Sequence, residues 1–108
     1  MWNKPSEKEL AELPRLYSTE DVPFDEKIIH MHFFIAQCDW YIAEYSPEER
    51  IFFGYANLGD DQMAEWGYIS LDELEEINIG GLEIDRDLWW KPIRFAEIAR
   101  RAHSYSDS

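Results

Sequence analysis

The chain has 108 residues, of which 45% are hydrophobic and 16% aromatic, so it is long enough and apolar enough to fold as one domain around its own core. Its 23 acidic and 10 basic residues give a formal net charge of −13, which argues against binding nucleic acid or anionic lipid. A single cysteine excludes an intrachain disulfide and a multi-cysteine zinc site, and no apolar run approaches the ~20 residues that span a bilayer. The opening MWNKPSEKEL also lacks the apolar core of a signal peptide, so we expect a cytoplasmic protein.

Residues 1–26 are predicted to form a short helix followed by an extended connector. Ser6 and Glu9 have the spacing of a capping box, in which each side chain bonds the backbone N–H of the other residue. A proline follows Leu13 and ends the helix, because the residue before proline avoids the α region.

Residues 27–70 are predicted to form an antiparallel meander of about four strands. The alternation in EKIIHMHFFIA places four apolar residues on one face of the first strand: Ile29, Met31, Phe33 and Ile35. The segments WYIAEY, IFFGYAN and AEWGYIS follow, separated by AQCD, SPEER and LGDDQM. These gaps are too short for the crossover that parallel strands require.

Residues 71–103 are predicted to be mainly helical. A second capping-box spacing introduces the short helix of LDELEEI, and Gly80-Gly81 marks a turn that allows a short edge strand. Pro92 suits the first position of a C-terminal helix, and residues 104–108 are expected to be a frayed tail. The expected architecture is therefore a single α+β domain over residues 1–108.

Two histidines and the cysteine suggest one possible metal site. His30 and His32 lie two residues apart on a predicted strand, so both side chains point to the same face. A third zinc ligand is available from Cys38 in the turn or Glu44 on the return strand. The alternative is that these histidines simply occupy the less apolar face of a hairpin. A nucleophilic role for Cys38 is disfavoured, because no glycine-rich loop or helix start follows it.

The charge is unevenly distributed along the chain. Residues 1–85 contain 20 acidic and 5 basic residues, a net charge of −15, whereas residues 86–108 contain 3 acidic and 5 basic residues, a net charge of +2. An acidic face of this kind steers association toward basic surfaces. A hydrolase would need two carboxyl groups across a substrate cleft, and a small meander offers little cleft.

Our candidate partner-binding residues are two acidic groups and a pair of adjacent tryptophans. Adjacent residues on one regular element cannot both point inward, so at least one tryptophan is expected at the surface. The candidates are Asp60, Asp61, Glu65, Asp72, Glu73, Glu75, Glu76, Trp89 and Trp90.

The order of motifs resembles a known family. The segments LPRLYSTEDVP, IIHMHFFIAQCDWYIAEYSPEE, FFGYANLGDD, AEWGYISLDELEEI and WKP are similar to a family of small acidic bacterial, plasmid and phage proteins known as a domain of unknown function. The resemblance covers nearly all of residues 1–92. Some proteins of this kind are reported as anti-CRISPR proteins that inhibit the type II effector nuclease.

The resemblance implies a non-enzymatic inhibitor that a mobile genetic element carries and that acts in the host bacterial cell. It supplies no catalytic residues, no cofactor and no residue-level assignment. CRISPR effectors hold nucleic acid in a positively charged channel, so a protein of net charge −13 suits such a partner. The alternative function is a small domain of a mobile element with structural zinc at His30, His32 and Cys38.

Overall fold

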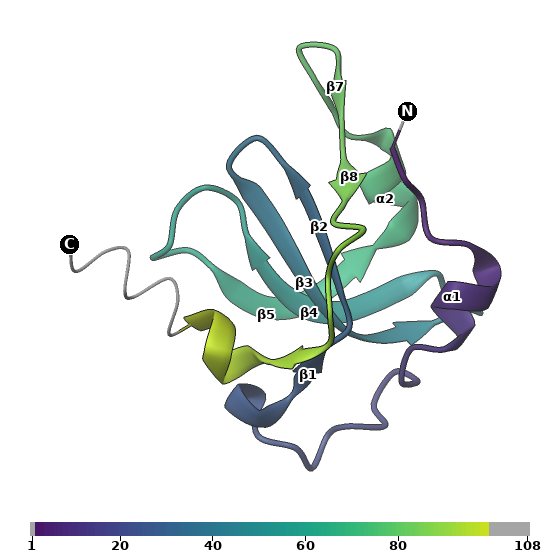
Figure 1. Cartoon of the computed structure of the whole chain (residues 1–108), viewed down its shortest axis with the longest axis vertical. Coiled ribbons are helices and arrows are strands. Elements are labelled where there is room, and N and C mark those ends of the chain that lie inside the picture. The colour runs from purple at the N-terminus through teal and green to yellow at the C-terminus, as the bar shows by residue number, and fades with distance from the viewer. Residues whose placement is uncertain (1, 100–108) are drawn as a thin grey trace.

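An antiparallel sheet of five strands forms the centre of the fold (Figure 1). The structure is a computed structural model, and it describes residues 2–99. The strands are β2 (Met31–Ile35), β3 (Cys38–Ser46), β4 (Ile51–Asn57), β5 (Glu65–Ser70) and β8 (Asp85–Arg86), in the spatial order β5-β4-β3-β2-β8. The predicted α+β class and the four-stranded meander are confirmed, but the sheet has a fifth strand. β8 was not predicted because a strand of two residues is too short to show an alternation of apolar and polar side chains. Its position beside β2 results from tertiary pairing.

Short helices flank the sheet. They are α1 (Glu7–Ala11), the 3₁₀ helix η1 (Phe24–Glu26), α2 (Leu71–Glu76) and residues 95–99. The capping box of α1 is confirmed, because Ser6 Oγ accepts from Glu9 N at 3.1 Å and Glu9 Oε1 accepts from Ser6 N at 2.9 Å. Leu71 and Leu74 of α2 are buried, so the predicted helix face is also correct. The connector is less extended than predicted, since it contains a series of turns and η1.

The predicted first strand is broken at His30. Its first part, β1 (Ile28–Ile29), leaves the main sheet and pairs with β9 (Ile93–Arg94). Ile29 consequently packs with Ala43 and Phe95, on a different core from Phe33. The expectation that Ile29 shares one face with Phe33 is therefore wrong. Strict alternation fails because the chain changes its pairing partner at this point.

The C-terminal region is less helical than predicted. The helix expected to begin at Pro92 begins at residue 95 instead, because Ile93–Arg94 is extended and forms β9. The Phe95 N–H donates to the Lys27 carbonyl oxygen at 2.9 Å, which continues this pairing. Residues 100–103 of the predicted helical region and the predicted tail at 104–108 lie outside the described residues.

A small hairpin also replaces part of the predicted helical region. β6 (Asn78–Ile79) and β7 (Leu82–Glu83) pair through Gly80 and Gly81, and the hairpin projects from the body of the molecule (Figure 1). The two glycines have φ values of 59° and 91°, which is the left-handed backbone that a two-residue hairpin turn requires. The predicted glycine turn is confirmed.

Two hydrophobic cores cover the two faces of the sheet. The first lies under α1 and α2 and includes Leu10, Leu13, Phe33, Trp40, Ile42, Phe52, Leu71 and Leu74. The second includes Ile29, Ala43 and Phe95, with Tyr41, Tyr55, Trp66 and Trp90 packed around them. Because the second core covers the other face of the sheet, β3 is buried on both of its faces.

Candidate functional site

A cavity of about 380 Å³ lies between the connector that precedes β1 and strands β3, β4 and β5. Its aromatic walls are Tyr17, Phe24, Phe53 and Tyr68, and its charged residues are Glu20, Asp21, Lys27 and Glu44. This volume falls in the range of ligand pockets, roughly 300–1,000 Å³.

A β-bulge in β3 directs Glu44 into this cavity. Ile42 pairs with Gly54 and Glu44 pairs with Phe53, so Ala43 is the extra residue. Without the bulge, alternation would place Glu44 on the same face as Ile42, inside the first core. The extra residue reverses the alternation, and Glu44 therefore shares the face of Phe53.

Lys27 and Glu44 form a buried ion pair at the base of the cavity. Their side chains are 4% and 3% exposed, and Lys27 Nζ lies 3.9 Å from Glu44 Oε2. Nζ donates to the carbonyl oxygen of Thr19 and, at 2.9 Å, to its hydroxyl. The Glu44 carboxylate accepts from Tyr17 N at 2.7 Å, from Thr19 N at 3.1 Å and from the Thr19 hydroxyl. Both charged groups therefore attach the connector to the sheet.

Aromatic rings from the connector and the sheet pack together beside this ion pair. Phe24 stacks on Trp66 of β5, with ring centroids 5.0 Å apart and planes at 22°. Lys27 Nζ lies 5.9 Å from the ring centroids of both Phe24 and Phe53, within the range of a cation–π interaction. The lysine charge is thus balanced by a carboxylate and two aromatic faces.

The mouth of the cavity combines exposed tyrosines with carboxylates. Tyr17 and Tyr68 are 56% and 61% exposed and meet edge to face, with centroids 6.4 Å apart. Hydrogen bonding with Tyr68 raises the pKa of Tyr17. Glu20 and Asp21 are exposed, and neither carboxylate has an ion-pair partner within residues 2–99. Tyr17 adopts a φ of 73°, a strained value for a non-glycine residue, and its bond to Glu44 helps to hold it there.

The predicted metal ligands are not brought together. His32 lies on the face of the sheet that the second core covers. Its Nε2 is 2.7 Å from Asp39 Oδ1, and its ring stacks on Tyr41 at a centroid distance of 4.7 Å. Cys38 packs instead against the first core. Burial lowers the pKa of His30. Among the described residues, no group of three histidine, cysteine or acidic side chains is arranged to hold a metal.

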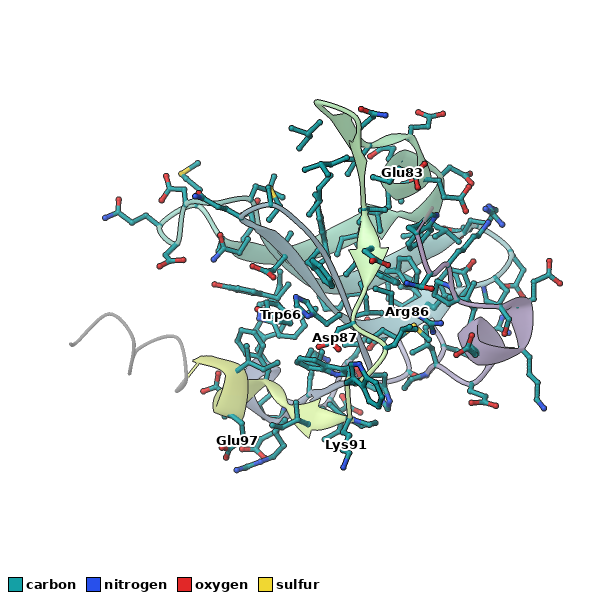
Figure 2. The ribbon with its side chains drawn as sticks, turned by 45° about the horizontal axis from the view of Figure 1, so that its top comes forward. Trp66, Glu83, Arg86, Asp87, Lys91 and Glu97 are labelled. Atoms are coloured by element: carbon teal, nitrogen blue, oxygen red, sulfur yellow. The ribbon has the colours of Figure 1, made fainter. Side chains whose placement is uncertain are left out.

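A second polar cluster lies near β8. Figure 2 shows Arg86 reaching from β8 toward α1, where its guanidinium pairs with Glu9 at 2.9 Å. This pairing holds the pKa of Glu9 well below its usual range, at about 2. Asp87 Oδ2 lies 3.9 Å from His32 Nδ1, which has no hydrogen-bond partner within the described chain. The cluster connects α1, β8 and β2, and its residues Glu9, Arg86 and Asp87 line a cavity of about 180 Å³, less than half the volume of the first.

The predicted acidic contact residues occupy two separate surfaces. Asp60, Asp61 and Glu65 lie in the β4–β5 loop and at the start of β5, whereas Asp72, Glu73, Glu75 and Glu76 lie on α2, beyond the end of β5. All seven are exposed. Arg50 pairs with Asp72 at 2.8 Å and with Glu75 at 3.4 Å, and Lys4 also pairs with Glu75. The α2 group is therefore partly neutralised, whereas the β4–β5 group has no ion pair within residues 2–99.

The two adjacent tryptophans divide between surface and interior. Trp89 is 90% exposed, in a turn where its N–H donates to Asp87 Oδ1 at 2.9 Å. Trp90 packs in the second core, and its Nε1 donates to the Ile29 carbonyl oxygen at 2.9 Å. Lys91, which follows, points away from the sheet (Figure 2). Trp89 is therefore the more accessible of the two to a partner, and Trp90 is partly buried.

Most of the residues that line the cavity were not predicted from the sequence. The register of the β2–β3 hairpin, with Met31 opposite Ile42 and Ile35 opposite Cys38, would place Ser46 rather than Glu44 opposite Lys27, so strand pairing gave no direct signal of the ion pair. The aromatic residues of the connector gave no periodic signal, because the connector is neither a helix nor a strand.

The chain matches the family described as "Protein of unknown function (DUF2958)" over residues 8–106, and it belongs to that family. The predicted resemblance to a domain of unknown function is thereby confirmed. No curated protein and no solved structure matches the chain. None of the helices in the described part of the chain is long and apolar enough to cross a membrane.

Proposed function

We propose that this member of the family is a non-enzymatic binding protein that recognises a basic surface on a protein partner. The observation that carries the proposal is the combination of unpaired carboxylates with exposed aromatic side chains. The carboxylates without an ion-pair partner in the described chain include Glu20, Asp21, Asp60, Asp61 and Glu65. Strongly exposed aromatic residues such as Trp89 are typical anchors of protein interfaces.

The buried ion pair supports binding rather than catalysis. Lys27 and Glu44 are the charged residues at the base of the cavity, where a general acid and base would be expected. Their hydrogen bonds are made to Thr19 and Tyr17 of the protein itself. The pair therefore acts as a structural connection in this proposal.

The proposed partner is a type II CRISPR effector nuclease, and the proposed effect is to block its handling of nucleic acid. Support for this partner comes from the resemblance to anti-CRISPR proteins and from charge. The effector's nucleic-acid channel is positively charged, and a protein of net charge −13 would be attracted to it.

Target-DNA cleavage by several purified type II effectors tests this function. The protein is added before or after guide RNA, and before or after target DNA. Loss of cleavage is expected, and the order-of-addition pattern identifies the blocked step. If a folded sample leaves every effector fully active, the proposed partner is wrong.

Charge reversal tests the contact surface. The triple variant Asp60→Lys, Asp61→Lys, Glu65→Lys should weaken inhibition, and the loss should be larger at low salt, where charge interactions are least screened. The matched control reverses three other exposed acids: Glu7→Lys, Glu12→Lys and Asp25→Lys. Equal inhibition by both triple variants would exclude the β4–β5 loop as a contact.

A further inference from the structure

The cavity beneath the connector has the chemistry of a site for a cation with a flat apolar face. Three carboxylates and one ammonium line it, so its formal charge is −2. Lys27 and Glu44 neutralise each other at the base. The uncompensated charge is that of Glu20 and Asp21, which are exposed and have no ion-pair partner in the described chain.

The walls of the cavity are aromatic on the connector side and on the sheet side. Phe24 is 51% exposed although it stacks on Trp66, so much of its surface is uncovered. Tyr68 is 61% exposed and meets Phe53 edge to face, at a centroid distance of 5.5 Å. Exposed aromatic faces beside carboxylates provide both interactions that a guanidinium makes, stacking and charge-assisted hydrogen bonds.

We propose that this cavity receives an arginine side chain of the protein partner. In this arrangement the guanidinium stacks against the exposed faces of Phe24 and Tyr68, and Glu20 and Asp21 bind its N–H groups at the mouth. The guanidinium stays at the mouth, away from the Lys27 ammonium at the base, and the aliphatic part of the arginine extends outward to the partner. The inference rests on the proposed function, because it assumes that the partner is a basic protein.

An anionic ligand does not suit the cavity. The Lys27 side chain is 4% exposed and its ammonium already donates to Thr19, so it offers little to an incoming carboxylate or phosphate. The carboxylates at the mouth would also repel an anion. Arginine is favoured over lysine because its guanidinium is planar, weakly hydrated and able to stack on rings while forming several hydrogen bonds.

Binding of short peptides to the intact protein tests the inference directly. The probes are acetyl-Gly-Arg-Gly-amide, the same peptide with lysine, and the same peptide with citrulline, which keeps the shape of arginine without its charge. Titrations are followed by amide and aromatic NMR shifts at low salt. The arginine peptide should shift the signals of Tyr17, Phe24 and Tyr68, and it should bind about tenfold more tightly than the citrulline peptide, which corresponds to ~1.4 kcal/mol. Equal binding of arginine and citrulline would overturn the inference, and this comparison needs no variant.

Substitutions at the mouth and wall locate the interaction. Glu20→Gln and Asp21→Asn should each weaken arginine-peptide binding by about threefold, in line with an exposed charge pair. The matched control is Asp25→Asn, which removes one exposed charge from η1 without touching the cavity lining. Phe24→Leu should reduce the preference for arginine over lysine, because it removes the ring and keeps an apolar side chain. Identical binding by the Glu20, Asp21 and Asp25 variants would show that the cavity is not the site.

The outcome is distinguishable from that of the nuclease assay. If an effector is inhibited but the arginine peptide does not bind, the cavity assignment is wrong and the proposed function stands. If the peptide binds as expected and no effector is inhibited, the cavity assignment stands and the proposed partner is wrong.

Discussion

Removing either member of the buried ion pair should destabilise the protein strongly. In Lys27→Met the Glu44 carboxylate stays buried without its counter-charge, and in Glu44→Gln the Lys27 ammonium does. The side chains are 4% and 3% exposed, so water cannot replace the lost partner. Breaking such a buried pair from one side costs about 3–5 kcal/mol.

This magnitude is a large part of the stability of a small domain, which is typically about 5–15 kcal/mol. For a chain of this size, each kcal/mol lowers the melting temperature by about 4–8 °C, so a loss of at least roughly 12 °C is expected. The double variant should be less destabilised than the sum of the two single variants, because it buries no unpaired charge. Glu44→Gln should also weaken the bonds to Tyr17 N and Thr19 N, since an amide has only one accepting oxygen.

Urea unfolding followed by tryptophan fluorescence and far-ultraviolet circular dichroism measures these effects. The matched control is the exposed pair Arg15–Glu48, whose atoms lie 2.6 Å apart but whose side chains are 63% and 64% exposed. Arg15→Met and Glu48→Gln should leave the unfolding midpoint almost unchanged. If Lys27→Met behaves like Arg15→Met, or if the effects at 27 and 44 simply add, the buried pair does not hold the connector.

Other predictions concern the bulge, the tryptophans and pH. Gly54→Ala should destabilise the protein by about 3 kcal/mol or more, because the added Cβ would lie 2.1 Å from a β3 carbonyl oxygen. In the control Gly67→Ala the added Cβ meets no atom within 4 Å, so this variant should be slightly more stable than the wild type. Comparable urea midpoints for the two variants would contradict the prediction. Trp90→Phe should destabilise by about 1–3 kcal/mol through loss of its buried hydrogen bond, and Trp89→Phe should have almost no effect. The folded-state pKa of Glu9 is lowered to about 2 from 4.5, so its stabilising contribution is complete above pH 4.5 and is lost as the pH falls toward 2. Melting temperatures from pH 6 to pH 2 should therefore fall less steeply for Glu9→Gln than for the wild type.

Local patterns in the sequence predicted the local structure well. The spacing of Ser6 and Glu9 predicted the start of α1, and Gly80-Gly81 predicted a turn, which the structure shows to be the turn of a hairpin. Each of these features depends on residues that are close in the sequence, so a short window contains the relevant physics.

Long-range pairing was much harder to predict. Nothing in Ile28–Ile29 distinguishes it from the rest of an alternating strand, yet it pairs with Ile93–Arg94, more than sixty residues away. The extended conformation of Ile93–Arg94 overrides the helix signal of Pro92, because the strand pairing and the Phe95–Lys27 hydrogen bond favour it. Propensity is a weak prior when tertiary contacts compete with it.

The cavity illustrates a second limit of sequence patterns. Alternation along β3 would have assigned Glu44 to the same face as Ile42, and only the extra residue Ala43 turns it toward Lys27. Gly54 of β4 lies beside this bulge, where the two backbones approach so closely that any larger residue would collide with the Tyr41 carbonyl oxygen. Gly54 therefore marks the point of β4 that faces the bulge, whereas Gly67, also inside a strand, pairs in a regular register and marks no reversal.

The geometry also separates residues that build the cavity from residues that would recognise a ligand. Glu44 binds the backbone N–H groups of Tyr17 and Thr19, so it positions the connector that supplies one wall of the cavity. Substitution of Glu44 should therefore reduce stability and binding together. Glu20 and Asp21 are exposed and unpaired in the described chain, so their substitution should reduce binding and leave stability almost unchanged. A variant at either mouth position that lowered the melting temperature as much as Glu44→Gln would mean that the acidic mouth is structural, and the cavity would lose its proposed means of attracting a basic partner.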